Sequence, residues 1–194
     1  MLLYTIQSLE VVRLLKQYSI YYAEFEKASY LQDEGMDAFE NAYHWMMAQY
    51  NQRKGHDFSS APVWWYTDIK EAQRTFLRLP LGSVLFAAEI PDKWILLHDA
   101  DLWYCPLNDA SCGWLGHPLN MSNTWTPEVD ALFDQLSSLY DLNQDAKEET
   151  WKEIFNLSKD RNQTIHAITP FIDLYWVEPK IQQAQDICGH VAEM

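Results

Sequence analysis

Short apolar segments recur along the chain and are bounded by Pro, Gly, Asn or Asp, a pattern that predicts β-strands. In residues 171–177, Ile172 and Leu174 alternate with Asp173 and Tyr175, as in a strand with one buried face. Pro91 and Asp92 are turn residues between the predicted strands 83–90 and 93–98, and they predict that these two strands pair as neighbours. The expected strands are residues 2–7, 62–66, 83–90, 93–98, 163–168 and 171–177.

Between these strands, apolar residues repeat with the helical period behind residues that can cap a helix. Ser8 precedes a helix to about residue 18, with Leu9, Val12 and Leu15 on one face. Sequences typical of a capping box open helices at residues 37, 68 and 145, and Thr-Pro at 126–127 opens another. The further expected helices are residues 37–54, 68–79, 126–140 and 145–155.

The predicted helix 37–54 carries one stripe of large, mainly aromatic residues. Its members are spaced three or four residues apart, which places them on one side of the helix, whereas Trp45, Gln49 and Arg53 lie away from it. Gly55 ends the helix, because glycine readily adopts the left-handed conformation of a helix terminus. The stripe consists of Phe39, Tyr43, Met46 and Tyr50.

The order of strands and helices indicates the fold class. Strands and helices come in groups, without an internal repeat, which is typical of an α+β domain with a mainly antiparallel sheet packed by several helices. The chain has 194 residues, of which 48% are hydrophobic, enough for a core and too apolar for a disordered chain. We expect a single domain over residues 1–178 and a tail or short helix over residues 179–194.

Charge and cysteine usage narrow the possible partners. Lys and Arg number 14 against 28 Asp and Glu, so the net charge is −14. Direct binding to duplex DNA is disfavoured, and a basic protein surface would be attracted. The three cysteines lack the spacing of a zinc site or a disulfide framework. Without a leader or a long apolar run, the sequence indicates a cytoplasmic protein with no membrane association.

Several motifs together resemble a family of small uncharacterised domains from bacteria and their mobile elements. Residues 4–7 read Tyr-Thr-Ile-Gln where the family has Trp-Thr-Ile-Gln, and residues 42–46 match Ala-Tyr-x-Trp-Met. Residues 96–104 correspond to Leu-Leu-Ser-Asp-Phe-Asp-x-Trp-His, and residues 151–155 to Trp-x-x-Ile-Phe. The resemblance spans about residues 4–177 and implies a shared fold, but no activity. The chain departs from the pattern at Tyr4, His98, Ala100 and Tyr104.

Residues 98–101 follow an apolar strand and offer candidate metal ligands. Carboxylates and imidazole suit Mg²⁺, Mn²⁺ or Zn²⁺, and metal-dependent nucleases use such groups to activate water. Asp99 and Asp101 are therefore weak candidates for a metal site, with His98 beside them. The alternative is that an acid at a strand end caps a turn or pairs with an arginine.

The order of elements also resembles that of ADP-ribosyltransferases, enzymes that use NAD. This resemblance implies a cleft lined by Thr5, Gln7, Tyr43, Trp65 and Gln163. Those enzymes normally place a catalytic Glu on a late strand, where this chain has Gln163, so the expected acid is missing. Under the alternative, Gln163 is a solvated strand residue and the aromatic residues belong to the core.

Acidic residues accumulate between residues 128 and 153, only partly offset by Lys147 and Lys152. Such a surface could imitate a phosphate backbone and occupy a nucleic-acid channel, although a charge run is usually a solvated helix face. Our leading hypothesis is a non-enzymatic inhibitor, without a cofactor, that blocks a basic nucleic-acid-processing enzyme, as in anti-defence or anti-CRISPR proteins. The residues expected to bind the partner are Asp130, Asp134, Asp141, Asp145, Glu148, Glu149 and Glu153.

Overall fold

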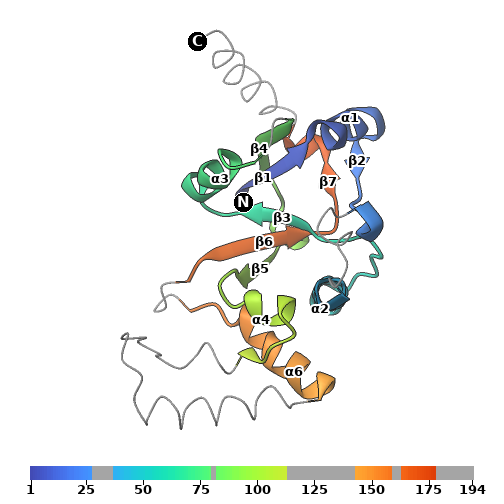
Figure 1. The fold of residues 1–194 in the computed structure, drawn as a ribbon. Helices are drawn as coiled ribbons and strands as arrows, with labels where there is room; N and C mark the ends of the chain where they lie inside the picture. Colours follow the sequence, from blue (N-terminus) through green and yellow to red (C-terminus); the bar gives the residue numbers. More distant parts are fainter. Residues whose placement is uncertain (28–36, 80–81, 113–142, 159–162, 178–194) are drawn as a thin grey trace. The chain divides into compact units, whose positions relative to one another are not determined.

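The computed structural model describes residues 1–27, 37–79, 82–112, 143–158 and 163–177 (Figure 1). The expected helix 126–140 lies outside these residues, and so do Asp130, Asp134, Asp141 and the tail 179–194.

A five-stranded, mainly antiparallel sheet organises the described chain, which confirms the predicted α+β class (Figure 1). The strand order is β4-β1-β3-β6-β5, and a second, two-stranded sheet pairs β2 with β7. β1 is antiparallel to both β3 and β4, and β3 is antiparallel to β6. The strands are β1 (Leu2–Ser8), β2 (Ile20–Tyr21), β3 (Val63–Tyr66), β4 (Ser83–Glu89), β5 (Leu96–Asp99), β6 (Ile165–Thr169) and β7 (Ile172–Asp173).

The predicted pairing of the third and fourth strands is wrong. β4 pairs with β1 along its whole length, whereas β5 lies at the opposite edge of the sheet, beside β6. The residues between them form a short 3-10 helix, η3 (Asp92–Trp94), rather than a tight hairpin turn. Turn residues mark where a strand ends but do not determine which strand comes next to it.

The helices begin largely where capping residues predict. They are α1 (Leu9–Tyr18), α2 (Asp37–Lys54), α3 (Ile69–Phe76), α4 (Tyr104–Leu107) and α6 (Gln144–Trp151), with 3-10 helices η1 (Phe25–Lys27) and η5 (Lys152–Phe155). The Ser8 hydroxyl accepts a hydrogen bond from the Val11 amide, and the Asp68 carboxylate accepts one from the Lys70 amide. The predicted start of α6 is wrong, because the residue that caps this helix is Asn143 instead of Asp145.

Two further predictions were wrong in detail. α1 buries Val11, Val12 and Leu15, whereas Leu9 is 50% exposed at the first position of the helix. The last expected strand is short: β7 contains only two residues, and residues 174–177 are helical. Asp173 explains this change, since its carboxylate accepts a hydrogen bond from the Tyr175 amide, two residues further on, and turns the chain out of the strand.

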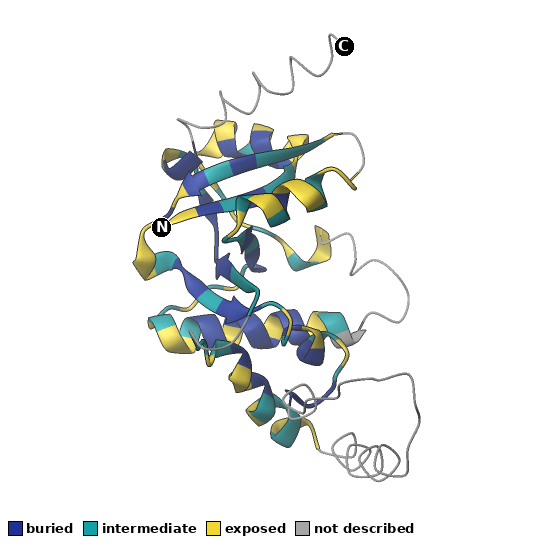
Figure 2. Cartoon of the chain, turned by 90° about the vertical axis from the view of Figure 1, so that its left-hand side faces the viewer, coloured by how far each residue is buried: buried dark blue, intermediate teal, exposed yellow. Residues whose placement is uncertain are grey.

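α2 has its predicted bounds but is buried more widely than its aromatic stripe indicates. Tyr43, Met46 and Tyr50 are buried, and so are Trp45 and Gln49. Gly55 follows the helix with a φ of 69°, the left-handed conformation expected of a terminating glycine. Figure 2 shows buried residues, in dark blue, along the sheet strands and on the inner sides of the helices.

The contacts divide the described chain into two compact units. The first draws on Met1–Glu34, Tyr43–Leu97 and Ile165–Met194, and the second on Gly35–Ala42 and His98–Thr164. The core of the first unit lies on one face of the sheet, around Leu3, Trp65 and Phe86. The single domain over residues 1–178 stays a prediction.

Candidate functional site

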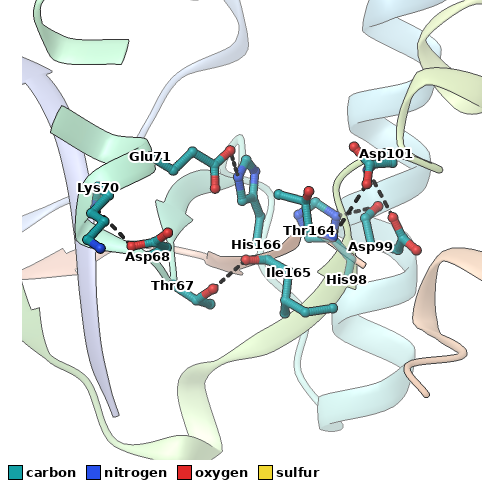
Figure 3. A network of polar contacts seen from close by, with 10 residues as sticks. All are labelled: Thr67, Asp68, Lys70, Glu71, His98, Asp99, Asp101, Thr164, Ile165 and His166. Carbon is teal, nitrogen blue, oxygen red and sulfur yellow. Dashed lines mark hydrogen bonds and ion pairs between the residues drawn. The ribbon is translucent and has the colours of Figure 1, made fainter. Parts of the chain in front are cut away.

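The candidate metal ligands lie at the end of β5 and in the polar turn that follows it, in the second unit (Figure 3). Asp99 is 4% exposed, and its Oδ1 accepts hydrogen bonds from the amides of Asp101 (2.9 Å) and Leu102 (3.1 Å). Asp99 Oδ2 accepts a third hydrogen bond from Gln163 Nε2, at 2.7 Å. Both carboxylate oxygens are therefore engaged by protein donors, an arrangement typical of a capped turn.

Gln163 holds this turn through both ends of its amide. Its Nε2 donates to Asp99, while its Oε1 accepts a hydrogen bond from the Ser158 amide at 2.9 Å. Nε2 also lies 3.5 Å from the carbonyl oxygen of Asn156. The orientation of the amide is thus fixed, because rotating it would place a donor against Ser158 and an acceptor against Asp99.

The neighbours of Asp99 make contacts of their own. The Ala100 amide donates to the Thr164 carbonyl at 2.8 Å, and the Thr164 amide lies 3.4 Å from Asp101 Oδ2. His98 is fully buried, with Nδ1 3.3 Å from the Asp99 carbonyl oxygen and its ring edge-on to Trp103. Among the described residues, no group of three or more His, Cys, Asp or Glu is placed to hold a metal ion.

Three residues of the expected NAD cleft lie on the core face of the sheet in the first unit. Gln7 Nε2 donates to the hydroxyl of Thr5 at 2.9 Å, and Thr5 is 1% exposed. Trp65 is equally buried, and its indole donates to Thr169 Oγ1 at 2.9 Å. The Thr169 hydroxyl in turn donates to the Phe171 carbonyl at 2.7 Å. Thr5 and Trp65 thus serve as core residues here.

Tyr43 and Gln163 lie in other surroundings. Tyr43 packs edge-on against Trp64, with ring centroids 5.2 Å apart. Because successive side chains of a strand point to opposite faces, Tyr43 and Trp65 lie on opposite faces of the sheet. Gln163 belongs to the second unit, where its contacts are made with Asp99 and Ser158. The NAD cleft stays a prediction.

A histidine–carboxylate pair in the first unit was missed by the sequence analysis. His166 Nε2 lies 2.9 Å from Glu71 Oε1, and the two side chains are 20% and 25% exposed (Figure 3). The Tyr66 ring packs edge-on against His166 from the paired position on β3. The alternation of β6 indicates only the face on which His166 lies, and no local pattern connects it to Tyr66 or to α3.

The described part of the acidic stretch is α6 with η5, in the second unit. Asp145, Glu149 and Glu153 are exposed, and Glu148 is half-buried. Three of these acids have local partners: Glu148 accepts from Gln144, Glu149 pairs with Lys152, and Glu153 accepts from Asn156. Lys147 points inward instead, and its ammonium lies 2.7 Å from Asp109 Oδ2.

The matched family spans almost the same residues as the motifs. A family model described as Domain of unknown function (DUF3841) matches residues 2–177. The chain belongs to the DUF3841 family. The resemblance to an uncharacterised family is therefore confirmed, whereas a bacterial or mobile-element origin stays a prediction. Neither the curated proteins nor the solved structures contain a match to this DUF3841 chain.

In the described segments of this DUF3841 chain, no helix has the length and apolar character needed to cross a bilayer.

Proposed function

We propose that this protein is a binding protein that uses its acidic surface to dock on a basic protein and block it. The surface consists of Asp145, Glu148, Glu149 and Glu153, which we call the α6 acidic surface. The partner fitting this charge is an enzyme that processes nucleic acids, whose substrate channel is itself cationic. The proposal includes a cytoplasmic location, which agrees with the two described cysteines being free thiols.

The proposal rests on the way in which α6 directs its lysine Lys147 inward and most of its carboxylates outward. Lys147 is turned inward against Asp109, with only 13% of its side chain exposed, and so contributes little positive charge to the surface. Asp145, Glu149 and Glu153 are exposed and Glu148 is half-buried, whereas Lys152 is the one exposed cation of α6 and η5. Such an imbalance produces a local negative potential, which steers and orients a cationic partner.

Rigid anchoring of α6 makes this surface suitable for binding. Trp151 is 1% exposed, and its indole donates to the Ala110 carbonyl at 2.7 Å. Ile154 is fully buried one turn further on, and the Thr150 hydroxyl accepts a hydrogen bond from the Cys112 amide. Carboxylates on a fixed helix lose less conformational freedom when they bind than carboxylates on a loose segment.

Affinity capture from host lysate, quantified by mass spectrometry, tests the proposal. The bait variant replaces the α6 acidic surface by Asp145→Asn, Glu148→Gln, Glu149→Gln and Glu153→Gln. We expect the wild type to retain a cationic nucleic-acid enzyme, with recovery that falls as salt is raised, and the variant to lose it. The captured enzyme, once purified, should lose activity when the wild-type protein is added.

A charge-matched control separates local from overall charge. It carries Glu10→Gln, Glu24→Gln, Glu26→Gln and Asp57→Asn, four neutralised carboxylates in the first unit. Equal capture of the enzyme by the control and the wild type would support a specific α6 surface. Equal capture by the α6 variant and the wild type, or capture insensitive to salt, would refute the proposal.

A further inference from the structure

β4 is an edge strand of the five-stranded sheet, and no described strand pairs with its outer side (Figure 1). Met1 and Ile90 donate a backbone hydrogen bond to each other at the start of the β1–β4 ladder, at 2.7 and 2.9 Å. In an antiparallel ladder every second pair is bonded in this way, so alternate residues of β4 face β1. The backbone groups of Leu85 and Ala87 therefore point out of the sheet. Those that face β1 belong to Val84, Phe86 and Ala88.

β4 lacks the features by which edge strands usually avoid pairing with another chain. Its sequence, Ser-Val-Leu-Phe-Ala-Ala-Glu, contains no proline and no lysine, and its single charged residue is the last one. All seven residues are in unbroken register with β1, so no bulge bends this edge away. A strand of this length and composition is open to pairing with a further strand.

The side of α3 that faces this edge carries an exposed leucine. α3 contacts β1, β3 and β4, and its Ala72 is fully buried. Glu71 lies about 100° to one side of Ala72 and meets His166 of β6, so Gln73, about 100° to the other side, faces the β4 edge. Leu77 follows four positions later on the same side and is 82% exposed. Apolar surface therefore lies beside the open strand.

The charges around β4 favour a second copy of this chain as the occupant. The chain has a net charge of −14, so two copies repel each other over most of their surface. Residues 68–89, which contain α3 and β4, hold three basic and three acidic residues, so their net charge is zero. A cationic partner would be drawn to the acidic remainder, whereas two copies can approach through this neutral stretch. The six residues are Lys70, Arg74, Arg78, Asp68, Glu71 and Glu89.

We propose that two copies of this chain pair through β4, antiparallel and related by a two-fold axis, so that their sheets become continuous. The register that uses all seven residues sets Leu85 opposite Ala87 of the second copy and Ser83 opposite its Glu89. The two Glu89 carboxylates are thus kept at opposite ends of the junction. Because strands lie about 4.8 Å apart, the two β1 strands are about 14 Å from each other, which leaves room for the Leu77 side chains between the two α3 helices.

Sedimentation equilibrium of the wild-type protein over a range of concentrations tests the pairing. The chain has a mass of 22.8 kDa, and we expect a reversible rise to twice this mass. Added salt should strengthen the dimer, because it screens the repulsion between two acidic copies, whereas it should weaken the binding proposed for α6. The two proposals can therefore fail separately. A protein that stays monomeric up to about 0.1 mM, or a dimer that salt dissociates, would overturn the pairing.

Amide hydrogen exchange, measured by NMR below and above the dimerisation concentration, locates the contact. The amides of Leu85 and Ala87 should exchange at least tenfold more slowly in the dimer. Those of Phe86 and Ala88 are bonded to β1 in either state and serve as internal controls, so they should change much less. Unchanged exchange at Leu85 and Ala87 in a dimeric sample would place the interface elsewhere and overturn the proposal.

Two variants at one position block the edge in different ways. Ala87→Pro removes an outward-facing amide without breaking a hydrogen bond to β1, and Ala87→Lys adds a positive charge to each side of the junction. Both should raise the dissociation constant of the dimer at least tenfold. Tyr18→Lys adds the same charge at a position of α1 that is 63% exposed, and should dimerise like the wild type. Circular dichroism identifies the variants that keep the native fold, and an undiminished dimer in either folded variant would refute the pairing.

Discussion

The hydrogen bond between Asp99 and Gln163 permits a test in which donor and acceptor are exchanged. Asp99→Asn places an amide nitrogen against Gln163 Nε2, so that two donors face each other at a contact of 2.7 Å. Gln163 cannot rotate without losing its hydrogen bond from the Ser158 amide. We expect this substitution to lower the free energy of unfolding by about 1–3 kcal/mol, the usual cost of a buried polar group without its partner.

Gln163→Glu should destabilise the protein for the opposite reason. It sets two carboxylates against each other, and Asp99 is 4% exposed, so water screens their repulsion poorly on that side. The double variant restores a donor at position 99 and an acceptor at position 163, while the new carboxylate keeps an oxygen for the Ser158 amide. The double variant should therefore be more stable than the sum of the single changes predicts, by about 1–3 kcal/mol.

Urea unfolding of the wild type, both single variants and the double variant measures this coupling energy. Asp101→Asn is a suitable control, since the Thr164 amide lies 3.4 Å from Asp101 Oδ2 and the group is exposed. It should change the free energy of unfolding by no more than about 0.5 kcal/mol. Strictly additive losses in the double variant would show that the two side chains do not hold each other, and the description of this turn would be wrong.

Three other predictions concern parts of the structure with clear partners. Burial raises the pKa of Tyr50, whose hydroxyl donates to the Trp94 carbonyl, so the unfolded chain loses its proton first as pH rises past about 10. The free energy of unfolding should therefore fall with pH in this range, and less steeply in Tyr50→Phe; parallel curves would contradict it. Trp151→Phe removes the indole donor to Ala110 and should cost about 2 kcal/mol in denaturant unfolding, whereas an unchanged midpoint would show that the contact contributes nothing. Because protein donors engage both oxygens of Asp99, adding Mg²⁺ or Mn²⁺, or removing metals with EDTA, should leave the melting temperature unchanged, and a cation-dependent rise lost in Asp99→Asn would restore the metal hypothesis.

Local signals in the sequence predicted the elements well where the cause is itself local. Ser8 and Asp68 cap the helices that follow them because each side chain meets an amide two or three residues later. The cap of α6 was misplaced by two residues because Asn143 and Asp145 are both good capping residues, and the choice depends on which one meets a free amide. The predicted pairing of β4 with β5 is wrong for a different reason, because the strand that lies next to another is determined by the whole sheet and not by the turn between them.

The candidate site was predicted in part. The sequence pointed to residues 98–101 at the end of a strand, with two interpretations of Asp99, as a metal ligand and as a turn cap. The deciding contact comes from Gln163, which is 64 positions away along the chain, and no periodicity carries that information. The Glu71–His166 contact, across 95 positions, was missed for the same reason.

The strand order has a consequence for how the chain reaches its native state. β6 lies between β3 and β5, yet its residues come after those of every other strand in that sheet (Figure 1). During synthesis the growing polypeptide must therefore keep the interior edge of β3 unpaired until residues 165–169 emerge. Fragments that stop earlier would present this edge, with its Val-Trp-Trp-Tyr sequence, to other chains and be prone to aggregate.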